Sequence, residues 1–293
     1  MHGAAQVDSD EALVGALITE QFPRWSGLPI RRVVSDGTSN AVYRIGRDLV
    51  ARLPLVEASE KQVIKEHAWL GEIAPLLPLT VPEPVEIGSP GHGYPWRWSI
   101  HRWIEGDNAD AAGIADMPRA VDDMARFISA LHAIDLPDPP HCRRNVPLSS
   151  SDDRTRRGIA ELREEFDADA LTAIWEDGLA APPWPGPPVW VHADLTDGNI
   201  LMRDGRLTAV IDWSMLGLAE PANDLDVAWD LFDRESRATF RAALGIDEAT
   251  WARARGWAVQ SVIGVTYYRA TNPGIVARCR RRLHTIIDDH ARG

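Results

Sequence analysis

One run of the sequence, VWVHADLTDGNILMRDGRLTAVIDW at 189–213, holds the residues best suited to chemistry. Its Asp-Gly pair at 204–205 is typical of a two-residue hairpin turn between two apolar strands. Counting back from this turn places Asn199 opposite Val210, and strand alternation gives Asp212 the same face as Val210. The Cα atoms of Asn199 and Asp212 are then expected to lie roughly 7–8 Å apart, so that both side chains converge on one ion.

A magnesium ion suits this pair of side chains. Mg²⁺ accepts an amide oxygen and a carboxylate, because it takes few protein ligands and completes its shell with water and phosphate oxygens. Upstream, Asp194 follows the apolar strand VWV and brings a further carboxylate to the mouth of the hairpin. Aspartate and asparagine are also common in turns and caps, so the prediction depends on three residues occurring together: Asp194, Asn199 and Asp212.

The spacing of these residues resembles a known enzyme family. His192-x-Asp194-x-x-x-x-Asn199 has the spacing of the kinase catalytic loop, and Asp212 stands where an aspartate opens the kinase metal-binding motif. The sequence reads Ile-Asp-Trp instead of Asp-Phe-Gly, and EPANDL follows at 220–225. On these motifs most of the chain resembles the aminoglycoside/macrolide phosphotransferase (antibiotic kinase) family.

The resemblance implies a role for each residue of the run. Asp194 would accept or orient the proton of the attacking substrate hydroxyl. Asn199 and Asp212 would hold Mg²⁺ on the nucleotide phosphates. His192 would orient the catalytic loop by hydrogen bonding, and Asp224 resembles a family aspartate that braces the loop. All four residues 192, 194, 199 and 212 are therefore assigned to the catalytic centre.

The nucleotide phosphates are expected near the N-terminus. The chain has no G-x-G-x-x-G motif, but DGTSN resembles the family's shorter phosphate loop, in which Gly37, Thr38 and Ser39 would face the β- and γ-phosphates. Taken alone, this segment would suit an ordinary hairpin turn. A kinase has lysine on its third strand, whereas this chain has Arg52, with Glu66 on the next helix as the expected partner.

The elements around these residues predict two lobes. Residues 30–55 are expected to form three antiparallel strands, 58–74 a helix, and two further strands lead to a hinge at about 100–104. At the hinge, backbone groups of Ile100 and Trp103 would hydrogen-bond the nucleotide base. The larger lobe is expected to be mainly helical, with helices from Asp116 and at about 153–180, 222–243 and 248–270.

The expected fold class is therefore α+β and bilobal, resembling protein kinases. A nucleotide-binding lobe with a small antiparallel sheet and one helix would span 1–103, and a helical lobe with the catalytic loop and acceptor site would span 104–293.

The acceptor is expected to bind the helical lobe. Asp226, Asp230 and Asp233 share one face of the helix predicted at 222–243. This carboxylate stripe would attract a cationic amino sugar, and so would the acidity of the whole chain. An ordinary solvated helix face would give the same pattern, so both interpretations stay open.

Composition limits the possible functions. The 293 residues include 31 basic and 43 acidic ones, a formal net charge of −12, which argues against nucleic-acid binding. Only Lys61 and Lys65 are lysines, so Arg52 must replace the usual phosphate lysine or leave that role vacant. Cys142 and Cys279 are far apart and outside any Cys-x-x-Cys motif, which suits a reducing compartment. No signal peptide or membrane span is recognisable, so a cytoplasmic protein is expected.

Together these patterns predict a phosphotransferase with an alcohol group as acceptor. It would move the γ-phosphoryl group of Mg-ATP or Mg-GTP to a hydroxyl of an aminoglycoside-like or macrolide antibiotic and so confer antibiotic resistance. The alternatives are a kinase of an amino alcohol or sugar metabolite and, because of Arg52, a nucleotide-binding pseudokinase. A protein kinase is disfavoured by the short segment between Asp212 and residue 220, and a metal hydrolase by the lack of a second histidine cluster. The acceptor, the choice of ATP or GTP and the oligomeric state stay open.

Overall fold

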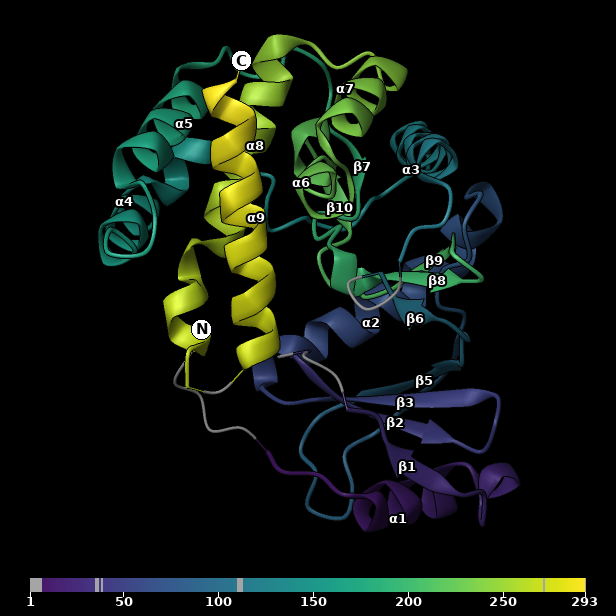
Figure 1. The fold of residues 1–293 in the computed structure, drawn as a ribbon. Coiled ribbons are helices and arrows are strands. Elements are labelled where there is room, and N and C mark those ends of the chain that lie inside the picture. The colour runs from purple at the N-terminus through teal and green to yellow at the C-terminus, as the bar shows by residue number, and fades with distance from the viewer. Residues whose placement is uncertain (1–6, 35–36, 38, 110–112, 271, 293) are drawn as a thin grey trace. The chain divides into compact units, whose positions relative to one another are not determined.

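The computed structural model describes residues 7–34, 37, 39–109, 113–270 and 272–292 (Figure 1). The chain divides into two compact units, Met1–Glu105 and Gly106–Gly293, which are described separately. The hinge predicted at about 100–104 stays a prediction.

The first unit is built on a five-stranded antiparallel sheet in the order β1-β2-β3-β5-β4. Helix α1 covers one face of this sheet and helix α2 lies on the other (Figure 1). Alternation decides which side chains face which helix: in β2, Tyr43 and Ile45 are buried against Leu17 and Ile18 of α1. The bounds are α1 Glu11–Gln21, η1 Pro23–Trp25, β1 Ile30–Arg32, β2 Asn40–Ile45, β3 Leu49–Pro54, α2 Glu57–Ile73, η2 Ala74–Leu76, β4 Pro84–Gly88 and β5 Trp98–Arg102.

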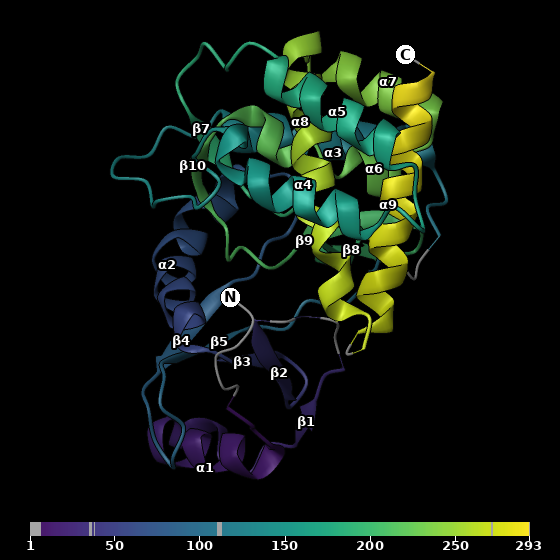
Figure 2. The same cartoon turned by 90° about the vertical axis from the view of Figure 1, so that its left-hand side faces the viewer.

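The second unit is mainly helical, and α5, α8 and α9 pack side by side (Figures 1 and 2). Its helices are α3 Met117–His132, η3 Leu148–Ser151, α4 Asp152–Glu161, α5 Ala168–Ala180, η4 Asp197–Asn199, η5 Pro221–Asp224, α6 Ala228–Leu231, α7 Arg234–Ala243, α8 Glu248–Val262, η6 Ile263–Tyr268 and α9 Pro273–Ala291. None of the described helices combines the length and apolar character needed to cross a membrane.

Two helices predicted in this unit are divided in the structure. The segment 153–180 forms α4 and α5, because Asp167 caps a new helix by accepting a hydrogen bond from the Ala170 N–H (2.9 Å). The segment 222–243 forms η5, α6 and α7, because Asp233 caps α7 by accepting one from the Ser236 N–H (2.9 Å). Apolar periodicity continued across both breaks and hid them from the sequence pattern.

Short strands flank the loop that carries Asp194 and Asn199. β7 Val189–Val191 pairs with β10 Gly217–Ala219, and β6 Asp107–Asn108 pairs with the first strand of the hairpin β8 Ile200–Arg203 and β9 Arg206–Val210. The connection from β7 to β8 is the segment that carries Asp194 and Asn199. The predicted mixture of a small antiparallel sheet unit and a larger helical unit is confirmed.

Candidate active site

The hairpin of β8 and β9 forms at its predicted turn. Asp204 and Gly205 have φ angles of 52° and 72°, the two positive values of a type I′ turn. Further along, a β-bulge makes Thr208 an extra residue on β9, and its hydroxyl donates to the Leu201 carbonyl (3.1 Å). The bulge shifts the pairing by one residue beyond this point.

The shift corrects the predicted position of Asn199. Val210 pairs with Ile200 instead of Asn199, and the Ile211 N–H donates to the Asn199 carbonyl (2.8 Å). Asp212 therefore lies one residue beyond the partner of Asn199. Asp212 lies after the end of β9 at Val210, and its φ angle of 58° is in the left-handed region. Strand alternation therefore does not set the direction of its side chain.

The donor atoms of this pair fit a magnesium ion. The Asn199 Nδ2 donates to the Asp194 carbonyl (2.9 Å) and to Asp194 Oδ2 (3.2 Å), which directs the Asn199 amide oxygen away from Asp194. That oxygen and the half-buried carboxylate of Asp212 are an amide and a carboxylate ligand, a small set of the kind Mg²⁺ accepts. Among the described residues there is no group of three or more His, Cys, Asp and Glu side chains that could hold a metal ion, so this smaller set is the candidate.

His192 joins the catalytic loop to the end of β9. The ring is buried; its Nδ1 accepts a hydrogen bond from the Asp194 N–H (3.2 Å), and its Nε2 lies 3.0 Å from the Ile211 carbonyl. Because a carbonyl only accepts, the proton in this contact lies on Nε2. Trp213 packs edge-on against this ring with centroids 4.7 Å apart. Both ring nitrogens of His192 are thus engaged by backbone groups, and its role in orienting the loop stays a prediction.

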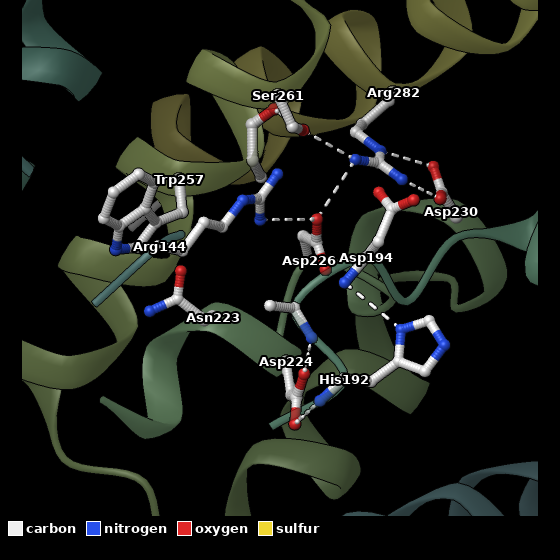
Figure 3. Close-up of polar contacts among 12 residues, drawn as sticks. Arg144, His192, Asp194, Asn223, Asp224, Asp226, Asp230, Trp257, Ser261 and Arg282 are labelled. Atoms are coloured by element: carbon white, nitrogen blue, oxygen red, sulfur yellow. Dashed lines mark hydrogen bonds and ion pairs between the residues drawn. The ribbon is translucent and has the colours of Figure 1, made fainter. Parts of the chain in front are cut away.

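Asp224 holds the turn between His192 and Asp194 (Figure 3). Its carboxylate accepts from the His192 N–H (3.2 Å) and the Ala193 N–H (2.7 Å), and it lies 3.1 Å from His132 Nε2. Ala193 has a φ angle of 62°, an unfavourable value for a residue with a side chain, and these hydrogen bonds maintain it. The predicted bracing contact of Asp224 is present.

The three aspartates expected on one acceptor-facing stripe do not form one. Asp226 is fully buried and precedes α6, Asp230 is buried within α6, and Asp233 caps α7. Arg282 donates to both oxygens of Asp230 and to Asp226 Oδ2 (3.4 Å) (Figure 3). Helical periodicity misplaced these residues because the helix is interrupted between them.

Among the described carboxylates of the second unit, Asp226 is buried and has the largest shift in pKa. Burial raises the pKa of Asp226 to about 7, against the opposing charges of Arg282 and Arg144. The nearby carboxylates of Asp230 and Asp194 raise this pKa further. Figure 3 accordingly shows the Asp194 carboxylate on the side of the loop that faces Asp226 and Arg282.

The first unit contains the predicted Arg52–Glu66 ion pair. Arg52 Nη1 donates to Glu66 Oε2, and both side chains are largely buried. In the predicted phosphate loop, Gly37 is exposed and the Ser39 carbonyl accepts from the Leu55 N–H (2.9 Å) at the entry to β2. Thr38 lies outside the described residues, so its predicted contact with phosphate stays a prediction.

Two predicted base contacts differ in the structure. Ile100 lies inside β5 between β3 and β4, so its backbone faces neighbouring strands. The Trp103 N–H donates to the Asp48 carbonyl (2.9 Å), and the Arg44 guanidinium lies 4.4 Å above the centre of the Trp103 ring. The Trp103 carbonyl is the group on which the predicted base contact now depends.

A model of the phosphotransferase enzyme family matches residues 31–257. The chain belongs to this family. The sequence is 25% identical over 115 residues to an aminoglycoside 3'-phosphotransferase of Escherichia coli, a match that covers 38% of this chain and 42% of that relative. It has the same identity, over the same share of each chain, to an aminoglycoside 3'-phosphotransferase of Salmonella typhimurium. The match thus spans less than half the length of these relatives.

Solved structures of such phosphotransferases have the same fold. The GDP complex of wild-type aminoglycoside 2'-phosphotransferase-IIIa has a TM-score of 0.73 at 17% identity, covering 97% of this chain and 99% of that one. Macrolide 2'-phosphotransferase type I has a TM-score of 0.61 at 19% identity, covering 95% and 98%. The family and the fold class predicted from the motifs are confirmed.

Some residues near the predicted site carried no recognisable signal in the sequence. His101 on β5 shares the Arg52 face of the sheet, and burial, with Arg52 and His67 nearby, lowers the pKa of His101 to about 3. Neither ring nitrogen of His101 has a hydrogen-bond partner in the described residues. In the second unit, Asn108 donates to the Gly198 carbonyl of the catalytic loop. Contacts between residues so far apart in the sequence leave no local sequence pattern from which they could be predicted.

Proposed function

We propose that this phosphotransferase moves the γ-phosphoryl group of a nucleoside triphosphate to a hydroxyl group of a small molecule, with Mg²⁺ as the metal. The observation that carries the proposal is the clustering of Asp194, Asn199 and Asp212 at one end of the hairpin, with Asn199 bonded to Asp194. A carboxylate beside a two-ligand magnesium site is the arrangement that in-line phosphoryl transfer needs.

In the proposed reaction, Asp194 takes the proton of the acceptor hydroxyl as that oxygen attacks the γ-phosphorus. The new O–P bond forms while the bond between the γ-phosphorus and the β,γ-bridging oxygen breaks, and the nucleoside diphosphate leaves with the bond's electron pair. Mg²⁺, when bound by Asn199 and Asp212, supplies neutralisation of the charge on the phosphate oxygens. His192 and Asp224 keep the loop in the geometry in which Asp194 reaches the hydroxyl.

The Arg52–Glu66 pair supports a nucleotide as the phosphoryl donor. A guanidinium held by a carboxylate is fixed in orientation, and its planar fork matches the geometry of phosphate oxygens. Structures with this fold contain bound nucleotides: a GDP complex of an aminoglycoside 2'-phosphotransferase, an ADP-bound relative and a ternary complex of streptomycin and ATP. ATP or GTP is the proposed donor, and the cytoplasm, where both are made, is the proposed location.

An aminoglycoside-like or macrolide antibiotic is the proposed acceptor, by similarity to the relatives. Asp226 and Asp230 are paired with Arg282, so this acceptor is not proposed to bind them. The alternatives remain an amino alcohol or sugar metabolite as acceptor and a pseudokinase that binds nucleotide without transfer.

The test is steady-state transfer from ATP and GTP to aminoglycosides, macrolides, amino alcohols and sugars. Asp194→Asn should lower kcat by about 10²–10⁴-fold and change the nucleotide KM by less than about threefold, because it removes the base and keeps the side-chain shape. Asp204→Asn is the matched control, since that carboxylate is exposed at the hairpin turn and should leave both constants unchanged. Transfer that survives in Asp194→Asn would refute the base assignment, and nucleotide binding without transfer would favour the pseudokinase.

A further inference from the structure

Three arginines of α9 lie on one side of that helix and reach the catalytic loop or its neighbours. Arg278, Arg281 and Arg282 follow the i, i+3, i+4 spacing that brings side chains to one helix face. Arg281 Nη2 lies 3.2 Å from Asp197 Oδ2, and Arg278 Nε lies 3.6 Å from Asp197 Oδ1. Asp197 lies in the sequence between Asp194, the proposed base, and Asn199, a proposed metal ligand. These ion pairs therefore connect α9 to the middle of the loop.

Asp230 makes a second link, through the backbone. Its Oδ2 accepts a hydrogen bond from the Asp197 N–H (3.2 Å). The side chain of Asp230 is only 4% exposed, so its position depends on the groups that bind it inside the protein. Asp224 accepts hydrogen bonds from the beginning of the loop, at His192 and Ala193. Asp230 accepts one from its later part, at Asp197.

Arg282 fixes Asp230. Its Nε donates to Asp230 Oδ1 (2.6 Å) and its Nη2 to Asp230 Oδ2, a two-pronged contact that sets the orientation of the carboxylate (Figure 3). Its Nη1 donates to Asp226 Oδ2 (3.4 Å) and to the Ser261 hydroxyl (2.9 Å) on α8. All three nitrogens of the Arg282 guanidinium group are therefore engaged, and the side chain is only 3% exposed.

We infer that Arg282 is a positioning residue for phosphoryl transfer: it holds Asp230 so that Asp230 fixes the Asp197 N–H and, with it, the loop from Asp194 to Asn199. The inference rests on the proposed function for its effect on catalysis, but its effect on the loop does not depend on that function. Only the planar fork of arginine can contact both oxygens of Asp230 and still reach Asp226 and Ser261.

Arg282→Lys separates positioning from a charge that merely stabilises the fold. Lysine keeps the positive charge, so it should preserve a role that depends on charge alone. It offers one nitrogen in place of three, so it should not preserve a role that depends on the geometry of the guanidinium group. We expect hydrogen exchange of the backbone amides at 193–199 to become at least about tenfold faster in Arg282→Lys, measured by mass spectrometry under native conditions. With an acceptor that is turned over, kcat should fall about tenfold or more while the nucleotide KM changes less than about threefold.

Arg237→Lys is the matched control. Arg237 is a buried arginine of the same unit that donates to Asp289 Oδ1 (3.1 Å) and the Phe232 carbonyl (2.6 Å), away from the catalytic loop. It should lower thermal stability without faster exchange at 193–199. Should Arg282→Lys fail to fold, Asp230→Asn tests the inference instead. This substitution keeps the size of the side chain and removes the charge-assisted hydrogen bonds to Arg282.

Equal loop exchange in Arg282→Lys and Arg237→Lys, or in Asp230→Asn and the unaltered chain, overturns the inference. Faster loop exchange in a protein that transfers phosphate to no acceptor upholds the positioning of the loop and refutes the proposed function instead.

Discussion

Replacing Asp226 with asparagine should change how the stability of the protein depends on pH. Burial raises the pKa of Asp226 from 3.8 to about 7, although Arg282 and Arg144 favour its charged form; Asp230 and Asp194 raise it as well. Between these two values the folded chain holds a proton that the unfolded chain has lost. The stability from that proton is therefore fully present below the unfolded pKa and is lost as the pH rises through about 7.

The size of the effect follows from the shift in pKa. One pKa unit corresponds to about 1.4 kcal/mol, so the whole shift is worth about 4 kcal/mol. Between about pH 5 and pH 8 the part that is lost is about 2–3 kcal/mol. Asparagine does not titrate, so the free energy of unfolding of the unaltered chain should fall by this amount relative to Asp226→Asn over that range.

Urea unfolding at both pH values measures this difference, with tryptophan fluorescence and circular dichroism required to give coincident transitions. Asp233→Asn is the control, because the Ser236 N–H lowers the pKa of Asp233 and keeps it ionised at both pH values. A difference between the unaltered chain and Asp226→Asn that stays constant within about 0.5 kcal/mol would refute the reasoning. It would mean that Arg282 and Arg144 outweigh burial and keep Asp226 charged.

Two further predictions concern the nucleotide and the loop. Arg52→Ala should raise the nucleotide KM by about 10–100-fold and lower kcat, because a charge-assisted contact with phosphate is worth about 1.5–3 kcal/mol; unchanged constants in steady-state kinetics would exclude Arg52 as a phosphate ligand. Asp224→Asn should lower kcat by about tenfold or more with little change in nucleotide KM, because the amide offers one acceptor oxygen to the two N–H groups of His192 and Ala193. The same kinetics test it, and an unaltered kcat would show that the loop keeps its geometry without this brace.

Local chemistry in the sequence was enough to predict the hairpin and the neighbourhood of its residues. Asp204 and Gly205 specify a turn by the φ angles they tolerate, and that turn alone brings Asn199 near the end of β9. The Arg52–Glu66 pair was predicted from the resemblance to kinases, which pair a cation on the third strand with a glutamate on the next helix. Both features depend on residues close together in the chain.

The bulge at Thr208 was not predictable in this way. Threonine in a strand is ordinary, and nothing in its neighbours indicates that its hydroxyl will bond to the Leu201 carbonyl and take an extra place on β9. This one residue changes the partner of Asn199 from Val210 to Ile211. Counting register from a turn is reliable only as far as the first irregularity.

The acidic residues near the loop show a second limit of sequence patterns. Asp226, Asp230 and Asp233 repeat as a solvated stripe would, yet the first two are buried. The cation that pairs with both of them is Arg282, 52 positions beyond Asp230. The spacing of the aspartates says nothing about this partner, because a buried charge is decided by what lies opposite in the folded chain.

The excess of arginine over lysine acquires a physical meaning from these contacts. Lysines number two among the 31 basic residues, so 31 − 2 = 29 are arginines. A buried carboxylate needs donors for both oxygens, and a guanidinium supplies them in one plane, whereas an ammonium supplies them from a single atom. Arg282 with Asp230 uses that geometry. Arg253 divides its donors differently: its Nε donates to Glu220 Oε2 and its Nη1 to the Pro182 carbonyl. Replacing such arginines by lysine keeps the charge and loses the geometry, so the loop that depends on Asp230 should respond to Arg282→Lys even though the net charge is unchanged.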